Sequence, residues 1–312
     1  MNVNALQPLL QRIGPRGRRL AAFAVFAGPV ILGVGLFSYI PVLWGFVLSF
    51  FEARGTVAPQ RFVGLSNYAS LVTDREFIRS LIMITVFGAV IVPLTVGLSL
   101  ALAVALRCIG WGRTFFRTIF FLPMTCSYVA GSLVWRMSLF NGQAYGVANM
   151  AGSVFGLQPV EWISAPSPPL YWVALVTVRL WLQCGFYVVI FLAALVEVPA
   201  SLYEAAHVDG ASGWQSFRHV TLPSIRNASV SILFLCTIGA FQAFDEFYNV
   251  MGGVASPGNI TMVRTPLIYL YDVAFTQQNY GYGSAGAFVL TLLIVVFSAM
   301  QSRVVGFGRA EG

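Results

Sequence analysis

Residues 20–51 form a run of 32 positions without one charged side chain. A helix needs about 20 consecutive apolar residues to cross the hydrocarbon core of a membrane, so this run predicts a membrane span. Pro29 and Pro41 lie inside the run and are expected to kink or bound the helix. Five more apolar segments follow. The spans are expected within 20–51 and at about 81–106, 118–135, 170–195, 228–251 and 283–300.

The composition agrees with this prediction. Only 9% of the residues are charged and 58% are hydrophobic, whereas about 25% of the residues of a soluble domain are charged. Helices in lipid associate through close van der Waals packing, so the core is expected to depend on how closely the side chains of neighbouring helices fit together. We therefore expect an all-α membrane protein with six transmembrane helices in the lipid bilayer and both ends on one side.

The 18 basic residues are all arginine, and they are spread over helix ends and loops. Because they form no patch or stripe, nucleic-acid binding is excluded. They are better explained as orientation signals: with the N-terminus inside, eleven face inward and six face outward. Four of the outer ones lie in the first outer loop, but the acid-free basic segment 1–19 is expected to dominate. Both termini are therefore predicted to be cytoplasmic, with no cleaved signal peptide.

The four cysteines are far apart in or beside apolar segments, where we expect them to fill space in a helix bundle. No metal-binding spacing or disulfide framework is expected. His207 and His219 lie in one polar loop without carboxylate or cysteine partners at ligand spacing, so they are interpreted as solvated.

The only long polar stretch between the two apolar halves is 204–223. Ser201 with Glu204, and Ser212 with Gln215, have the spacing of a capping box at a helix start. Gly210 lies between them, where a helix can end in a left-handed residue. The stretch therefore predicts two short helices joined by a tight turn.

A stop or kink is expected at Pro223, which lacks an amide hydrogen. The first short helix places small residues and one acid on a single face. The second carries two bulky aromatic residues expected to anchor it. These two sets are Leu202, Ala205, Ala206 and Asp209, and Trp214 and Phe217.

Glu204-Ala205-Ala206, Gly210 and Leu222-Pro223 resemble, in identity and spacing, the EAA loop of bacterial ABC importer permeases. The resemblance implies a cytoplasmic coupling helix between the fourth and fifth spans, docked on an ATPase subunit. It implies coupling residues at Glu204, Ala205, Ala206, Asp209, Gly210, Trp214, Phe217 and Pro223. Glu204 is expected to contact a basic group in the ATPase or in a neighbouring loop, to cap its own helix, or to do both.

Two further segments carry the resemblance. Residues 62–68 are similar to a segment typical of the first of two permeases in carbohydrate importers, and Phe121-Leu122-Pro123 is similar to the third helix of the family. Implied partners are a second permease, two copies of an ATPase that bind ATP and Mg, and an extracytoplasmic solute-binding protein. The chain itself is expected to be non-catalytic and to hold no cofactor, and without lysine it cannot contain a phosphate-binding P-loop.

The location implied is a bacterial inner membrane. The chain is expected to divide into 1–80, with the cytoplasmic tail, first span and first outer loop; 81–302, a five-helix core with the coupling loop 197–226; and a short cytoplasmic tail at 303–312.

By the same resemblance, six residues of the fourth and fifth spans fall on the solute path: Gln183, Phe186, Cys236, Ala240, Ala243 and Phe247. Those on the fifth span share one helical face. This face is small and apolar, so the companion permease could supply the solute contacts instead. Ordinary helix packing is at least as well supported for each of the six.

Arg179, Asp245 and Glu246 lie in or near spans. Charges at membrane depth usually pair or face a cavity. We predict that Arg179 pairs with Asp245 or Glu246 near an outer gate.

The solute expected by resemblance is a sugar, with glycerol phosphate or its diesters as an alternative. An ion-coupled secondary transporter would show internal repeats and discontinuous helices, and no convincing repeat is evident. An intramembrane serine enzyme is a third possibility, because residues 281–286 are rich in glycine around Ser284. Both histidines lie in the cytoplasmic loop, away from that serine, so no dyad forms.

Overall fold

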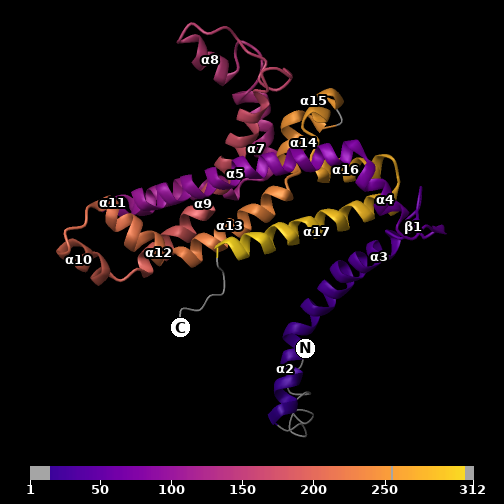
Figure 1. Cartoon of the computed structure of the whole chain (residues 1–312), viewed down its shortest axis with the longest axis horizontal. Coiled ribbons are helices and arrows are strands. Elements are labelled where there is room, and N and C mark those ends of the chain that lie inside the picture. The colour runs from indigo at the N-terminus through magenta and orange to yellow at the C-terminus, as the bar shows by residue number, and fades with distance from the viewer. Residues whose placement is uncertain (1–14, 254–255, 306–312) are drawn as a thin grey trace, which may run out of the picture. The chain divides into compact units, whose positions relative to one another are not determined.

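The computed structural model describes residues 15–253 and 256–305, most of them helical (Figure 1). The chain divides into two compact units, one of residues 1–70 with 273–288, the other of residues 71–272 with 289–312. The predicted all-α class is confirmed. The cytoplasmic tails were predicted partly on residues 1–14 and 306–312, which lie outside the described residues. The expected division after residues 80 and 302 stays a prediction.

The first unit is built on one long helix that continues past two prolines. It contains α2 (Pro15–Val34), η2 (Gly35–Tyr39), α3 (Ile40–Leu48), β1 (Phe51–Glu52), β2 (Arg61–Phe62), most of α4 (Ser66–Thr73), most of η7 (Asp272–Thr276) and the start of α17 (Tyr280–Val305). The expectation that Pro29 or Pro41 bounds the helix is wrong, because one apolar helix runs from Arg19 to Leu48. The wider π-helical turn of η2 ends at Tyr39, two residues before Pro41, whose missing amide hydrogen would leave a normal turn without a donor.

Residues 62–68 close the end of this helix. Asn67 donates its side-chain amide to the carbonyls of Ser49 and Phe51, at 2.9 and 3.1 Å. The hydroxyl of Tyr68 donates to Ser49 Oγ at 2.7 Å. The carbonyls at a helix end have no partner within the helix, so these bonds satisfy part of that need. Residues 62–68, which resemble a segment of known permeases, therefore stabilise the end of this helix.

The second unit holds the rest of the helices. They are α5 (Arg75–Cys108), α6 (Arg113–Phe121), η3 (Leu122–Thr125), α7 (Tyr128–Val134), η4 (Trp135–Leu139), α8 (Val147–Ser153), α9 (Tyr171–Glu197), α10 (Ala200–Val208), α11 (Gly213–Ser216), η5 (Phe217–Thr221), α12 (Leu222–Ser224), α13 (Arg226–Phe241), α14 (Asp245–Met251), α15 (Pro257–Met262), α16 (Pro266–Tyr271) and the remainder of α17. Asp74 caps α5 by accepting from the amides of Glu76 and Phe77.

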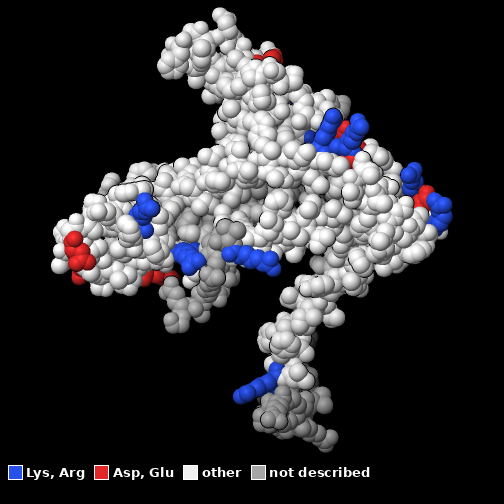
Figure 2. Space-filling view, in the orientation of Figure 1, with Lys and Arg blue, Asp and Glu red and all other residues white. Residues whose placement is uncertain are grey.

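The centre of the second unit is the packing of α5 against α9 (Figure 1). Ser99 of α5 donates its hydroxyl to the Cys184 carbonyl at 3.2 Å. A Cβ atom on Gly185 would meet the carbonyl oxygen of Phe120, so α9 and α6 approach as closely as only glycine permits. Figure 2 shows few charged side chains on the face in view, and α5 carries none between Arg79 and Arg107.

Among the described residues, four helices are long and apolar enough to cross a membrane, and up to six spans result if each of two bent pairs counts as one. The four cover residues 19–48, 75–108, 171–197 and 280–303. In the bent pairs, 113–125 meets 128–139 at 97°, and 213–224 meets 226–241 at 70°. The number of spans expected from the sequence is thus compatible with the structure, but the third span is broken.

The fifth span is also interrupted, which corrects the prediction of a continuous helix over 228–251. Helix α13 ends at Phe241, and α14 begins at Asp245. The amide of Ala243 bonds to Ala240 instead of continuing the α-helical ladder to Gly239. The carbonyl groups freed at the break accept hydrogen bonds from side chains. Arg179 donates to the carbonyl of Gly239, and Thr265 donates to the carbonyl of Ala243. Tertiary donors therefore stabilise the break.

Candidate functional site

The loop 197–226 has the predicted helix, turn and helix, beyond one end of α5 and α9 (Figure 1). Gly210 has φ +73°, as expected for the turn. The capping box of Ser212 and Gln215 is confirmed, with the Ser212 amide donating to Gln215 Oε1 at 2.7 Å and the Gln215 amide to Ser212 Oγ at 3.4 Å. These contacts define where α11 begins.

The other predicted capping box is wrong. Helix α10 begins at Ala200, so its N-cap is Pro199 and Ser201 already lies in the first turn. Glu204 is exposed, and its carboxylate has no hydrogen bond or ion pair within 15–253 and 256–305. Glu204 therefore does not cap its own helix, and its charge is available to another molecule.

The loop exposes apolar side chains, as expected of a docking surface. Leu202 is 45% exposed, Val208 86% and Trp214 68%. The expectation that Trp214 anchors α11 is therefore wrong, although its ring stacks on Phe217 with centroids 5.5 Å apart. Ala205, Asp209 and Gly210 are exposed, and Ala206 and Phe217 are half-buried. Exposed apolar groups of this kind mark interaction surfaces.

A polar anchor that the sequence did not reveal joins the loop to α5. Arg107 Nη1 donates to the hydroxyl of Tyr203 at 2.8 Å, and its guanidinium lies 4.7 Å from the centre of the Tyr203 ring. The same hydroxyl lies 3.0 Å from Thr221 Oγ1. One tyrosine thus connects α10, η5 and the end of α5. Arg107 is 96 residues from Tyr203 in the sequence, and no spacing rule relates it to the loop.

A stop or kink was predicted at Pro223, and the structure has a kink two residues later. The helix continues through the proline to Ser224, and the bend of 70° falls at Ile225. The π-helical turn η5 comes just before the proline, as η2 does in the first unit. The two histidines are exposed, as interpreted, and no cluster of three metal-binding side chains occurs among the described residues.

The predicted ion pair of Arg179 is confirmed, and its partner is Glu246. Arg179 Nη1 lies 2.5 Å from Glu246 Oε1, with side chains only 5% and 1% exposed. Arg179 Nη2 donates to the carbonyl of Gly239, and the guanidinium lies 5.6 Å from the centre of the Tyr128 ring. Asp245 is exposed. The charge is thus enclosed between α9, α7 and the break between α13 and α14.

The six residues expected on the solute path fall into two groups. Four are buried within the chain, with at most 4% of their surface exposed: Cys236, Ala240, Ala243 and Phe247. Phe247 packs edge-on against Phe87, with ring centroids 4.8 Å apart. In this conformation these four face no open path and serve packing. Gln183 and Phe186 are half-buried on α9. A role in the path stays a prediction.

The chain is similar to known transport proteins in sequence and in fold. Residues 95–305 match the family described as binding-protein-dependent transport system inner membrane component. The lactose transport system permease protein LacF of Rhizobium radiobacter is 31% identical over 287 residues, which cover 89% of this chain and 91% of LacF. The arabinooligosaccharides transport system permease protein AraP of Bacillus subtilis is 31% identical over 294 residues, 94% of this chain and 91% of AraP.

A similar fold occurs in a solved bacterial ABC transporter involved in the import of the acidic polysaccharide alginate. The two chains superimpose with a TM-score of 0.80 at 20% sequence identity, over 98% of this chain and 100% of the other. The family match covers more than half of the sequence, and the permeases above cover nearly all of it. The chain therefore belongs to the family of inner membrane components of binding-protein-dependent transport systems.

Proposed function

We propose that this chain is a non-catalytic permease subunit of an ABC importer that carries a sugar or short oligosaccharide into a bacterial cell. The relatives named for lactose and arabinooligosaccharides support a sugar over a glycerol phosphate ester. The membrane is the cytoplasmic membrane, crossed six times, with both termini inside as the arginine distribution indicates. A second permease and a solute-binding protein complete the path for the solute.

The observation that carries this proposal is the loop 197–226, which presents exposed apolar side chains and an unpaired carboxylate. Val208 and Trp214 are mostly exposed, although burial of such groups is favourable. An ATPase subunit with an apolar groove and a basic rim would cover them and pair with Glu204. ATP and Mg would be bound by two copies of that partner, because this chain has no P-loop.

Movement of the ATPase subunits would reach the membrane helices through the polar anchor. Tyr203 is held by Arg107 and Thr221, so a push on α10 acts on the end of α5 and on η5 together. Packed elements of this kind transmit small displacements as rigid bodies. The loop then works as a coupling helix.

The break between α13 and α14 is our candidate for the outer gate. A helix interrupted next to a buried ion pair can change its bend without losing backbone hydrogen bonds, provided that the donors move with it. Of the six residues expected on the solute path, Gln183 and Phe186 of α9 are the two that are not buried within the chain. A second permease would form the opposite wall of the path.

Co-purification tests the coupling role. The tagged chain is extracted from its native membrane in mild detergent as wild type, Glu204→Lys and Trp214→Ala, and the accompanying proteins are identified. We expect an ATPase and a second permease with the wild type, and loss of the ATPase alone from both variants. Phe155→Ala, which removes a side chain that is 83% exposed between the expected third and fourth spans, is the matched control.

The proposed docking surface is wrong if both loop variants retain the ATPase as the wild type does. The solute is tested separately with the importer reconstituted in vesicles with its binding protein and ATP. Uptake of lactose or an arabinooligosaccharide, but not of glycerol phosphate, is expected.

A further inference from the structure

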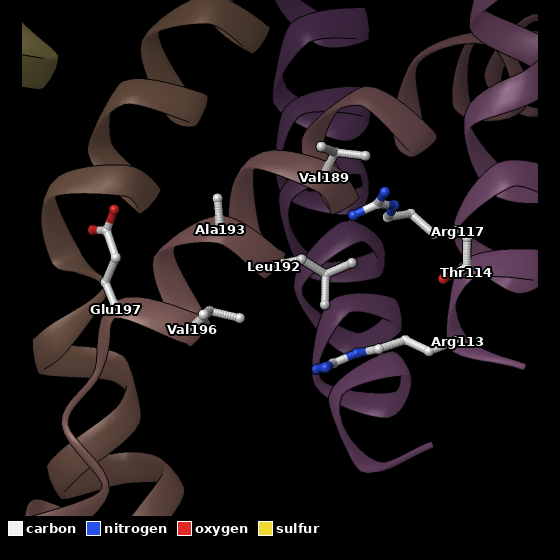
Figure 3. Close-up of a pocket in the computed structure, with 8 residues that line it drawn as sticks. All are labelled: Arg113, Thr114, Arg117, Val189, Leu192, Ala193, Val196 and Glu197. Carbon is white, nitrogen blue, oxygen red and sulfur yellow. The ribbon is translucent and has the colours of Figure 1, made fainter. Parts of the chain in front are cut away.

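A pocket of about 410 Å³ lies between α6 and the last turns of α9 (Figure 3). It shares only Glu197 with the loop 197–226, and it is separate from the buried ion pair. Its lining residues are Arg113, Thr114, Arg117, Val189, Leu192, Ala193, Val196 and Glu197. One side of the pocket is therefore basic and the other is aliphatic, which is an uncommon combination on a helix that crosses a membrane.

The basic side comes from one face of α6. Arg113 and Arg117 are four residues apart, so their side chains lie one above the other. In Figure 3 both guanidinium groups extend from α6 toward α9. Neither has a hydrogen bond or an ion pair within the described part of the chain. The hydroxyl of Thr114 lines the same pocket. Two unpaired guanidinium groups beside a hydroxyl form a donor set suited to a phosphate group.

The aliphatic side comes from α9. Val189, Leu192, Ala193 and Val196 follow each other at three- and four-residue spacing and so form one strip. In the view of Figure 3 this strip lies between the two arginines and Glu197. The carboxylate is thus at the far end of the pocket from the guanidinium groups, and the arginines are free to bind an external anion.

We propose that this pocket binds an anionic phospholipid, with its phosphate on Arg113 and Arg117 and its glycerol and first acyl carbons along the α9 strip. Basic pockets between helices near the membrane surface have the chemistry that phospholipid head groups require. A free inorganic phosphate would use the arginines but would leave the aliphatic strip uncovered. The inference rests only on the chain spanning a membrane, and it does not depend on the coupling role of the loop.

The test uses the purified importer with whatever subunits accompany this chain. Short-chain phosphatidylglycerol, short-chain phosphatidylcholine and inorganic phosphate are titrated separately, and binding is read by native mass spectrometry and thermal unfolding. We expect the wild type to prefer phosphatidylglycerol. The double variant Arg113→Gln/Arg117→Gln should lose roughly 30-fold in affinity for it, from about fivefold for each arginine at a membrane surface.

Two controls separate the pocket from general charge. Arg303→Gln removes an exposed arginine at the end of α17, outside the pocket, and should keep the preference. Glu197→Gln should strengthen binding of phosphatidylglycerol. If the double variant does not fold, Arg113→Lys/Arg117→Lys, which keeps the charge, should show weakened but selective binding.

Three outcomes overturn the proposal. The double variant could keep the wild-type preference, which would place the lipid elsewhere. Inorganic phosphate alone could stabilise the wild type as much as phosphatidylglycerol does, which would make a free anion the ligand. The double variant could lose a partner subunit while lipid selectivity is unchanged, which would make the pocket a protein contact.

Discussion

Charged groups are usually exposed and apolar groups are usually buried. The buried ion pair and the loop 197–226 each depart from one half of this rule. At the break between α13 and α14, Arg179 and Glu246 are charged and almost completely enclosed. In the loop, Val208 and Trp214 are apolar and mostly exposed. An enclosed charge is tolerated only while its partner is present. An exposed apolar group leaves the chain itself stable but favours a partner molecule.

The same contrast is present in the backbone. Near Phe241 the helix ends inside the protein, and its free carbonyls are bonded by Arg179 and Thr265 from other elements. In the loop, α10 ends at Val208, the chain turns at Gly210, and Ser212 caps the start of α11, so this break uses neighbours in the sequence. The first break therefore depends on tertiary structure and the second on local sequence. Substitutions at the first break should therefore change the stability of the protein more than substitutions in the loop.

The largest effect is expected from Glu246→Gln. It leaves Arg179 charged and enclosed without its anion, which should cost about 3–5 kcal/mol of unfolding free energy. Thermal or denaturant unfolding in detergent measures it. Asp245→Asn, at the exposed neighbour, should change stability by less than about 0.5 kcal/mol. If Arg179→Leu/Glu246→Leu is no more stable than either single change, the pair does not act as a unit.

Gly185→Ala comes next and tests the packing of the buried region. The added Cβ would meet the Phe120 carbonyl, so α9 and α6 must separate, at a cost of about 1–3 kcal/mol. Gly97→Ala on α5 is the control, because no atom lies within 4 Å of its added Cβ. It should stabilise the protein by up to about 1 kcal/mol through helix propensity. Equal unfolding temperatures for the two variants would contradict this packing.

Tyr203→Phe tests the anchor of the loop. The ring stays, but the hydrogen bonds to Arg107 and Thr221 are lost, one of them to a charged donor. A loss of about 1.5 kcal/mol is expected. Hydrogen exchange should speed up in α10 and η5, while the ATPase still co-purifies because the exposed surface is unchanged. Unaltered exchange would show that the hydroxyl does not hold the loop.

The smallest effect is expected from Ser212→Ala, which removes the side-chain cap of α11 and should cost about 1 kcal/mol. Ser201→Ala is its matched control, because Ser201 lies inside α10 and caps nothing there. That variant should stay within about 0.5 kcal/mol of the wild type. Both values can be read from the exchange rates of the loop amides. A larger loss of stability for Ser201→Ala than for Ser212→Ala would indicate that Ser201 caps α10 after all.

The sequence predicted what depends on composition and neighbouring residues. The uncharged run 20–51 is long enough to require a membrane helix, and the structure has one there. Gly210 and the Ser212–Gln215 pair define the turn of the loop because each acts within a few residues. The pairing of Arg179 was also predictable, since a charge at membrane depth needs a partner. The choice of Glu246 over Asp245 was not, because both lie at the same break.

By itself, then, the sequence determined the helical membrane class, the family resemblance and the local turn chemistry. The tertiary structure alone decided where helices break, which residues are enclosed, and that Tyr203 joins Arg107 to Thr221. It also brought Arg113 and Arg117 of α6 beside the aliphatic strip of α9. The physical reason is distance along the chain. Hydrophobicity and capping act within one segment, whereas a free carbonyl or a buried charge is satisfied by whichever donor the packing brings near.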